Sequence, residues 1–294
     1  MIGAKRWGEA ALLYCAVCWG STFFIVKHAL RDLQPLPLIA YRFLFSALLI
    51  LPFLRGRSLR AGLPQGALLS VFVVTLFLSQ TVGLQWTTAT NSGFITGLFV
   101  LFVPVFGLVL FSRKPRPSQW VAIILALAGL WLLTGGILGF NRGDGLTLIA
   151  AAAYALHLLL TDRYVKTGDP VVLAFHQLWI TGLSALLAGA ASRASFRISA
   201  TPDWFVIGFL ALFPTVLGFF AQMVGQRHVS PIRAALLLSL EPGFAAIFSW
   251  RLGGEAMTLN IEAGGGLILA AILLSELSRL GADAARHLNA AEQR

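Results

Sequence analysis

Residues 92–111 read SGFITGLFVLFVPVFGLVLF, an apolar run that contains no charged side chain. A helix needs about 20 predominantly apolar residues to cross the hydrocarbon core of a bilayer, so this run can span a membrane. The whole chain shares this character: 57% of its 294 residues are hydrophobic, 12% are charged, and the mean hydropathy is +0.81. A soluble domain carries about 25% charged residues. The composition excludes a soluble enzyme, a disordered chain and a disulfide-rich secreted module, and it predicts an integral membrane protein.

The chain contains ten apolar runs of comparable length, most of them joined by short connections. They cover residues 8–26, 36–54, 66–84, 92–111, 119–137, 146–163, 171–189, 204–224, 232–250 and 260–278. The runs are continuous rather than alternating, which predicts helices and not the strands of a barrel. No small-residue cleavage pattern follows the first run, so we expect it to remain as a helix.

Lys and Arg residues are unevenly distributed between the two sides of the predicted membrane protein. Of the 22, fifteen fall on the side of the chain ends, six fall on the other side, and Arg42 lies within a run. Because loops rich in Lys and Arg remain in the cytoplasm, this split predicts that both termini are cytoplasmic. The positive charges are scattered between apolar runs and form no basic patch, so we expect no nucleic-acid partner.

The two halves of the sequence resemble each other at an offset of 135 residues, which later drifts. The corresponding positions are Gly8-Glu9 with Gly143-Asp144, Trp19 with Tyr154, Pro35 with Pro170, and, at an offset of 138, Pro104 with Pro242. Each half holds five runs, and an odd number makes the second half enter the membrane from the opposite side. We therefore predict two inverted five-helix repeats, residues 1–137 and 143–281, followed by a cytoplasmic tail, residues 282–294. Such repeats are typical of secondary transporters.

Two ionisable residues fall at membrane depth, where charges are costly and usually functional. Glu241 lies at the midpoint of the run 232–250, directly before Pro242. It is either a protonated carboxyl that donates to a carbonyl freed by the proline, or a group that titrates as substrate or protons pass. Arg42 can snorkel to the interface, pair with a buried carboxylate, or bind the carboxylate of a substrate.

Other polar and aromatic residues within the runs suggest a central cavity. Its predicted members are Trp19, Asn91, Tyr154, His157 and Glu241. The aromatic pair Trp19 and Tyr154 can equally be core packing, and His157 and His176 can be satisfied core histidines rather than a proton relay. Pro104, Pro214 and Pro242 predict helix breaks, the places where transporters build their sites.

No cofactor or metal site is predicted. Cys15 and Cys18 form a CxxC spacing, but both lie in an apolar run without a cationic neighbour, so we interpret them as packing residues.

Several segments together resemble the EamA family of the drug/metabolite transporter superfamily. They are CWGSTFF at 18–24, AYRFL at 40–44, TTATNSGFI at 87–95, SLEPGFAA at 239–246 and LGGE at 252–255. The resemblance covers about residues 8–277. The chain departs from the family pattern in one respect. The family has an acidic residue in the turn after the fourth helix, but residues 112–115 (SRKP) contain none. The acidic residue of this turn is therefore present only in the second half, as Glu255.

The resemblance implies a ten-helix bundle around a central cavity, lined by the third, fourth, eighth and ninth helices with the first and sixth. It also implies export of small metabolites, with amino acids, aromatic ones included, first among them. We thus expect a monomeric, multi-pass secondary transporter of a bacterial inner membrane, working by alternating access with a small-molecule substrate. Alternatives are an exporter of cationic drugs or other toxic compounds and, in a different class, an intramembrane enzyme or a channel.

Overall fold

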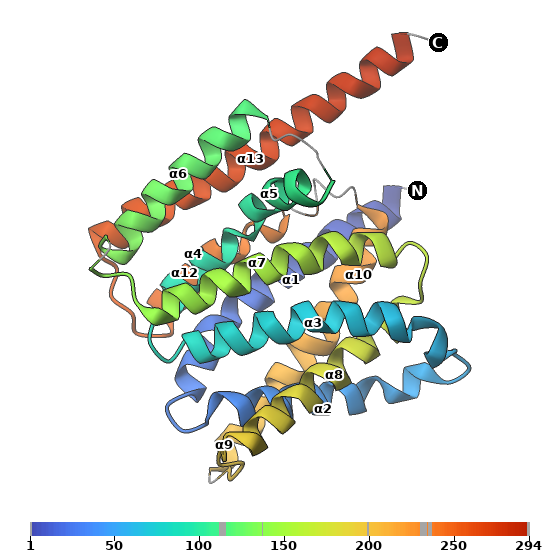
Figure 1. Ribbon diagram of the computed structural model, residues 1–294, viewed down its shortest axis with the longest axis vertical. Coiled ribbons are helices and arrows are strands. Elements are labelled where there is room, and N and C mark those ends of the chain that lie inside the picture. Colours follow the sequence, from blue (N-terminus) through green and yellow to red (C-terminus); the bar gives the residue numbers. More distant parts are fainter. Residues whose placement is uncertain are drawn as a thin grey trace.

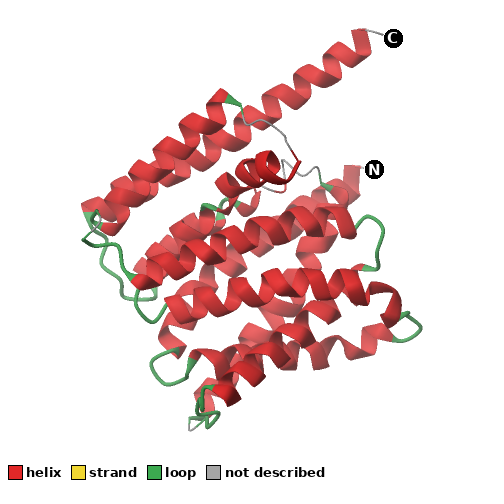
Figure 2. Cartoon of the chain, viewed as in Figure 1, coloured by secondary structure: helices red, strands yellow, loops and turns green. Residues whose placement is uncertain are grey.

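The computed structural model describes residues 2–111, 116–136, 138–198, 200–229, 234 and 237–292, and every regular element in these ranges is helical (Figure 2). The first half contains α1 (Ile2–Ala29), α2 (Pro35–Ile50) with the 3₁₀ turn η1 (Leu51–Leu54), α3 (Leu59–Gly83), α4 (Ala89–Gly97), α5 (Phe99–Phe111) and α6 (Pro117–Thr134). The second half contains α7 (Arg142–Tyr164), α8 (Pro170–Ala191), α9 (Thr201–Leu210), η2 (Ala211–Leu217), α10 (Gly218–His228), α12 (Glu241–Arg251) and α13 (Leu259–Glu292).

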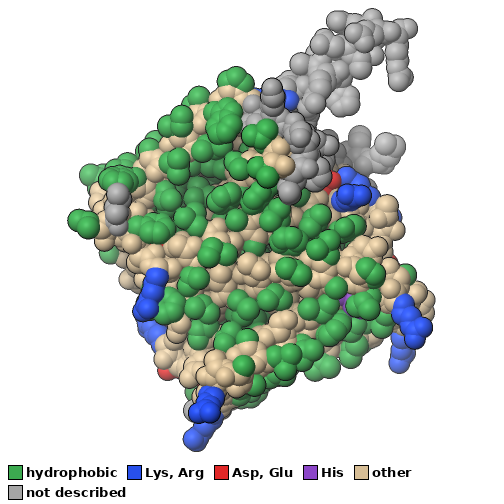
Figure 3. All heavy atoms as spheres, viewed as in Figure 1, with side chains coloured by type: hydrophobic (Ala, Val, Ile, Leu, Met, Phe, Trp, Pro, Cys, Tyr) green, Lys and Arg blue, Asp and Glu red, His purple; other side chains and the backbone are tan. Residues whose placement is uncertain are grey.

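Most of the predicted runs are present as membrane-length helices. Within the described residues, eight segments are long and apolar enough to cross a membrane, and Leu259–Ser275 forms a further, shorter apolar helix. Figure 3 shows hydrophobic side chains over the face between the two ends of the helices, with Lys and Arg near the ends. This distribution is the one expected of a helical bundle in a bilayer.

Three of the spans are interrupted within the described residues, and one of the three interruptions lies away from the prolines named above. The span Ala89–Val109 is broken at Leu98, between α4 and α5, whereas Pro104 lies inside α5. Pro104 is the sixth residue of α5, so it lies past the first turn and leaves the carbonyl of Val100, four residues back, without its helical donor, yet the helix continues to Phe111. Pro214 lies inside η2, a π-helical stretch between α9 and α10. Pro242 is the second residue of α12, directly after a turn at Ser239 and Leu240.

The ninth span therefore differs from the prediction. Glu241 is the first residue of α12 and not the middle of a continuous helix. Residues 230–233 and 235–236, at the start of that predicted run, lie outside the described residues.

Helices from the two halves pack against each other throughout the bundle (Figure 1). The neighbouring pairs are α2 with α8, α3 with α7, α1 with α10, α4 with α12, and α6 with α13. Figure 1 shows the N- and C-terminal ends of the chain at the same end of the bundle. Helix α13, with 34 residues, is about 50 Å long and so exceeds the thickness of a bilayer core.

Candidate functional site

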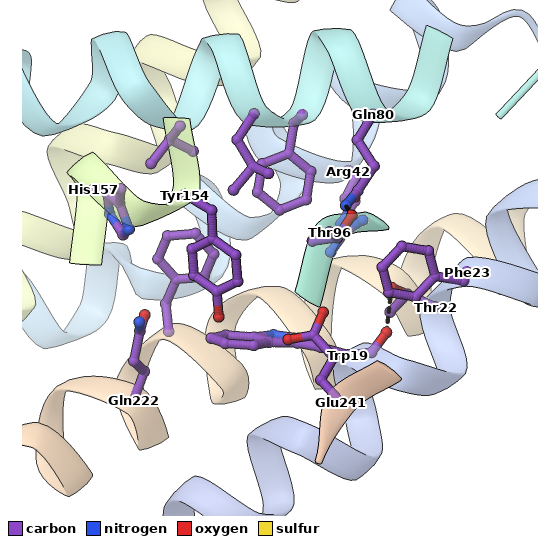
Figure 4. A pocket seen from close by; sticks show the side chains of 14 residues that line it. Trp19, Thr22, Phe23, Arg42, Gln80, Thr96, Tyr154, His157, Gln222 and Glu241 are labelled. Atoms are coloured by element: carbon purple, nitrogen blue, oxygen red, sulfur yellow. Dashed lines mark hydrogen bonds between the residues drawn. The ribbon is translucent and has the colours of Figure 1, made fainter. Parts of the chain in front are cut away.

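A cavity lies in the middle of the bundle, between helices of both halves (Figure 4). Its empty volume is about 490 Å³, a figure that includes the space open to solvent at its mouth. The residues that line it are Trp19, Thr22, Phe23, Arg42, Val73, Leu76, Phe77, Gln80, Thr96, Tyr154, His157, Phe219, Gln222 and Glu241. The family resemblance did not include α2 among the helices that line the cavity, but Arg42 of α2 is one of the lining residues.

Aromatic rings form much of the cavity wall. The ring of Trp19 meets the rings of Tyr154 and Phe219 edge to face, with centroids 6.3 and 6.4 Å apart. Phe77 lies on the opposite helix, α3, and its ring centroid is 4.9 Å from the guanidinium carbon of Arg42. The wall offers flat apolar surface together with one cation held over a ring.

Polar groups from the first half are engaged within the protein. The indole nitrogen of Trp19 donates to the carbonyl of Pro214 over 2.7 Å. The amide of Gln80 donates to the hydroxyl of Thr96 over 3.0 Å, and the hydroxyl of Thr22 donates to the carbonyl of Trp19 over 2.7 Å. These bonds fix the shape of this half of the wall.

Arg42 enters the cavity from α2 and points into the bundle. Its side chain is 4% exposed, and its Nε donates to the hydroxyl of Thr215 over 2.7 Å. The ion pairs found among the described residues, Arg57–Asp169 and Lys166–Asp162, do not involve it. A buried guanidinium without a carboxylate partner in the described chain is available to an anionic group of a ligand.

Polar groups from the second half are different, because several of their atoms are buried without a partner among the described residues. These atoms are the Tyr154 hydroxyl, Nδ1 of His157, Nε2 of Gln222 and Oε2 of Glu241. All four residues line the cavity, and Figure 4 shows Tyr154 and Glu241 approaching the same space beside Trp19. Buried polar atoms are usually paired, so these unpaired ones leave hydrogen-bonding groups for a ligand or for water inside the cavity.

His157 illustrates how this side of the site is ordered. Its Nε2 lies 2.6 Å from the side-chain oxygen of Gln177, whose amide group donates to the carbonyl of Leu173. That arrangement assigns the proton to Nε2 and leaves Nδ1 as an acceptor. The sequence had left open whether His157 is a satisfied core histidine, and it is satisfied at one nitrogen only.

The structure brings together four of the five predicted cavity residues: Trp19, Tyr154, His157 and Glu241. Asn91 is not among the lining residues; it lies in the first turn of α4, and its side-chain oxygen is buried without a partner among the described residues. The predicted core role of His176 fits its contacts, since both ring nitrogens are bonded, to Leu59 and Trp179.

Sequence reasoning did not select Thr22, Gln80 and Gln222, which also line the cavity. A usable signal existed in the repeat. Thr22 corresponds to His157 at the offset of 135, and Gln80 corresponds to Gln222 at 142. Because His157 was a predicted site residue, this correspondence would have pointed to Thr22, whereas Gln80 and Gln222 correspond only to each other and neither had been predicted.

Comparison with known proteins assigns the family. The model of the EamA-like transporter family matches residues 6–135 and again residues 141–277. The chain belongs to the EamA-like transporter family. An "Uncharacterized transporter" of Archaeoglobus fulgidus is 32% identical over 276 residues, which cover 94% of this chain and 88% of that protein. The "Uncharacterized inner membrane transporter YedA" of Escherichia coli is 29% identical, with 92% and 90% covered.

A solved structure, "Crystal structure of protein", shares the fold of this EamA-like transporter. It superposes with a TM-score of 0.68 at 17% sequence identity and covers 95% of this chain and 99% of its own. The chain is thus a membrane transporter, and the cavity lies where helices of its two family-model matches meet.

The contrast between Trp19 and Tyr154 predicts opposite effects of two similar substitutions in this EamA-like transporter. Tyr154→Phe removes a hydroxyl that has no partner among the described residues, so we expect unchanged thermal stability and about tenfold weaker transport. Trp19→Phe leaves the carbonyl of Pro214 without its donor, so we expect a loss of about 1–3 kcal/mol of stability. Thermal unfolding in detergent and uptake by proteoliposomes measure the two effects. A Tyr154→Phe protein that is destabilised but transports normally would contradict the assignment.

Proposed function

We propose that the protein exports amino acids across the inner membrane, as a monomer, by alternating access of the central cavity. The observation that carries the proposal is the combination in one cavity of Arg42, Glu241 and an aromatic wall. A zwitterion presents a carboxylate to the guanidinium and an ammonium group to the carboxyl group, while the rings cover its side chain. Neither charged group has a charged partner within the described protein, which leaves both for the substrate.

Alternating access requires two halves that exchange roles, and the cavity lining supports ten helices arranged as inverted repeats. Four pairs of corresponding residues face the same cavity. They are Trp19 with Tyr154, Thr22 with His157, Phe77 with Phe219, and Gln80 with Gln222. Arg42 and Glu241 break this symmetry, since Gln177 stands at the position that corresponds to Arg42.

Helix packing supports the same arrangement. The contact of α1 with α10 corresponds, after exchange of the halves, to the contact of α7 with α3. Both crossings are close at corresponding glycines: a Cβ atom on Gly143 would overlap the carbonyl of Gly83, and one on Gly8 would lie 2.8 Å from Val229. Symmetry of this kind is what inverted repeats produce.

Transport is tested by counterflow in proteoliposomes. Liposomes preloaded with one unlabelled amino acid at a time, with a few organic cations as competitors, should accumulate the labelled form transiently. Accumulation is the expected result, because a carrier exchanges substrate across the membrane. A channel shows none, and an enzyme would return the label in a changed compound.

An exporter of organic cations is the second candidate, and a specific observation favours it. Glu241 is buried beside Trp19 with a free oxygen, and a carboxyl group next to aromatic rings also suits a cationic drug. Arg42 separates the candidates, since it attracts the carboxylate of an amino acid and repels a cation.

The orientation of the protein in the membrane can be tested separately from its transport activity. The distribution of Lys and Arg places both termini in the cytoplasm. Ser58 and Leu138, both exposed, lie in loops that this orientation puts on opposite sides. In a Cys15→Ala, Cys18→Ala background, an impermeant thiol reagent should label Leu138→Cys on intact cells and Ser58→Cys only after lysis. The reverse pattern would invert the proposed topology.

A further inference from the structure

The turn between α3 and α4, residues 84–88, connects two helices that line the cavity. Gln80 precedes the turn by one helical turn, Thr96 follows it in α4, and the two side chains are bonded to each other. Figure 1 shows this turn at the end of the bundle opposite to the chain termini. Movement of the turn would therefore change the cavity wall at that end.

Glu255 holds the start of α4 from another part of the chain. Its Oε1 accepts from the backbone N–H of Ala89 over 2.6 Å, and its Oε2 accepts from the N–H of Thr90 over 3.0 Å. The hydroxyl of Thr88 accepts from the next N–H, that of Asn91. A carboxylate bound by two N–H groups at a helix N-terminus is strongly favoured, because the helix dipole and the free donors act together.

The position of Glu255 is itself fixed. Its backbone N–H donates to the carbonyl of Ser249 in α12 over 3.1 Å, and Gly254 before it has a positive φ of 71°. Helix α12 in turn touches α4 directly, since a Cβ atom on Gly97 would overlap Pro242. Glu255 thus connects the N-terminal end of α4 to α12, the helix that begins with Glu241.

Two further charged side chains hold the same turn from other helices. The ammonium group of Lys27, in the last turn of α1, donates to the carbonyls of Leu84 and Thr87 over 2.6 and 2.9 Å. A cation at the C-terminus of α3 complements the helix dipole there. Asp144, in the first turn of α7, accepts from the hydroxyl of Thr87.

We propose that Lys27, Asp144 and Glu255 form a turn clamp that closes one end of the cavity, and that this end opens only when Glu255 and Lys27 release the α3–α4 turn. The clamp joins the turn to α1, α7 and the segment between α12 and α13. Glu255 is a positioning residue, since it acts on the cavity through α4. This inference rests on the proposed alternating-access function.

Accessibility of the cavity from each side tests the clamp. The reporter is Thr22→Cys, in the Cys15→Ala, Cys18→Ala background, and the probe is an impermeant methanethiosulfonate reagent applied to vesicles of either orientation. Leu138→Cys marks the side on which the clamp lies. We expect Glu255→Ala to raise labelling from that side about tenfold and Glu255→Gln to raise it less, because one amide oxygen replaces only one of the two bonds.

Glu262→Gln is the matched control, because Glu262 is an exposed carboxylate in the first turn of the neighbouring α13. It should label like the parent. Lys27→Met, which keeps the apolar stem and removes the cation, should repeat the effect of Glu255→Ala and serves if that variant does not fold.

An increase in labelling from one side of the membrane only distinguishes a clamp from a contact that merely stabilises the fold. Unchanged labelling from the clamp side, or an equal increase from both sides, would overturn the proposal. Counterflow by the parent protein is measured in parallel. If the parent exchanges no amino acid but labelling still rises on one side only, the substrate assignment is wrong and the clamp remains.

Discussion

Glu241→Gln is expected to reduce export of zwitterionic amino acids about 100-fold while the protein keeps its thermal stability. The substitution preserves the size and hydrogen bonding of the side chain but removes the charge that attracts an ammonium group. Losing one partner of a buried charge pair costs about 2–5 kcal/mol. A carboxylic-acid analogue without the amino group should compete in the variant at least as well as in the parent, because it has no ammonium group for Glu241 to attract and its carboxylate is no longer repelled. Counterflow with the two competitors measures the difference, and Glu262→Gln provides the control.

The same variant distinguishes a proton carrier from a substrate ligand. If Glu241→Gln exchanges amino acids normally and loses only the dependence of efflux on the pH gradient, Glu241 carries protons and does not bind the ammonium group. If Glu241→Ala is stable and behaves as the parent in both assays, Glu241 has neither role.

Arg42→Gln is expected to reduce export by a similar factor, because it removes the group that would bind the carboxylate of the substrate. The variant removes the guanidinium from a cavity in which the side chain is only 4% exposed, so a substrate carboxylate would lose its buried cation. We expect about a 100-fold loss of amino-acid export. Arg42→Lys should restore little of it, since a single ammonium group cannot reproduce the planar guanidinium held by Thr215 and Phe77.

Competition with amines that lack a carboxylate completes this test. Such amines should bind Arg42→Gln at least as well as they bind the parent, and Arg31→Gln, an exposed arginine in the loop after α1, should leave both classes unaffected. If Arg42→Gln exports amino acids normally and the parent prefers organic cations, the protein is an exporter of cations and the amino-acid proposal fails.

Hydropathy accounts for the part of the fold that sequence could predict. The length of an apolar run is dictated by the bilayer, so runs such as 36–54 and 171–189 correspond closely to α2 and α8. Interruptions inside a run were less predictable. Proline shows that a backbone bond is missing, but the neighbours decide whether the helix continues, as at Pro104, or ends before the proline, as at Pro242.

The candidate site was predictable to the extent that polarity at membrane depth is unusual. Glu241, Arg42 and His157 stand out in apolar surroundings, and all three line the cavity. Asn91 stood out for the same reason, but it lies in the first turn of α4 and is not among the residues that line the cavity. Which polar atoms remain unpaired, as in Tyr154 and Gln222, depends on contacts between distant helices that no pattern within a run reveals.

The π-helical stretch η2 determines the rotation of α10, the helix that continues directly from it. A π turn closes with one more residue than an α turn, so it rotates the downstream helix by about 100° relative to an unbroken α-helix. Two consecutive hydrogen bonds lie at this stretch. Arg42 donates to the hydroxyl of Thr215, and that hydroxyl donates to the carbonyl of Leu210, five residues back. Phe219 and Gln222 then face the cavity. The π-helical stretch in the second half thus both provides a hydrogen-bond partner for the arginine of the first half and determines which face of α10 lines the cavity.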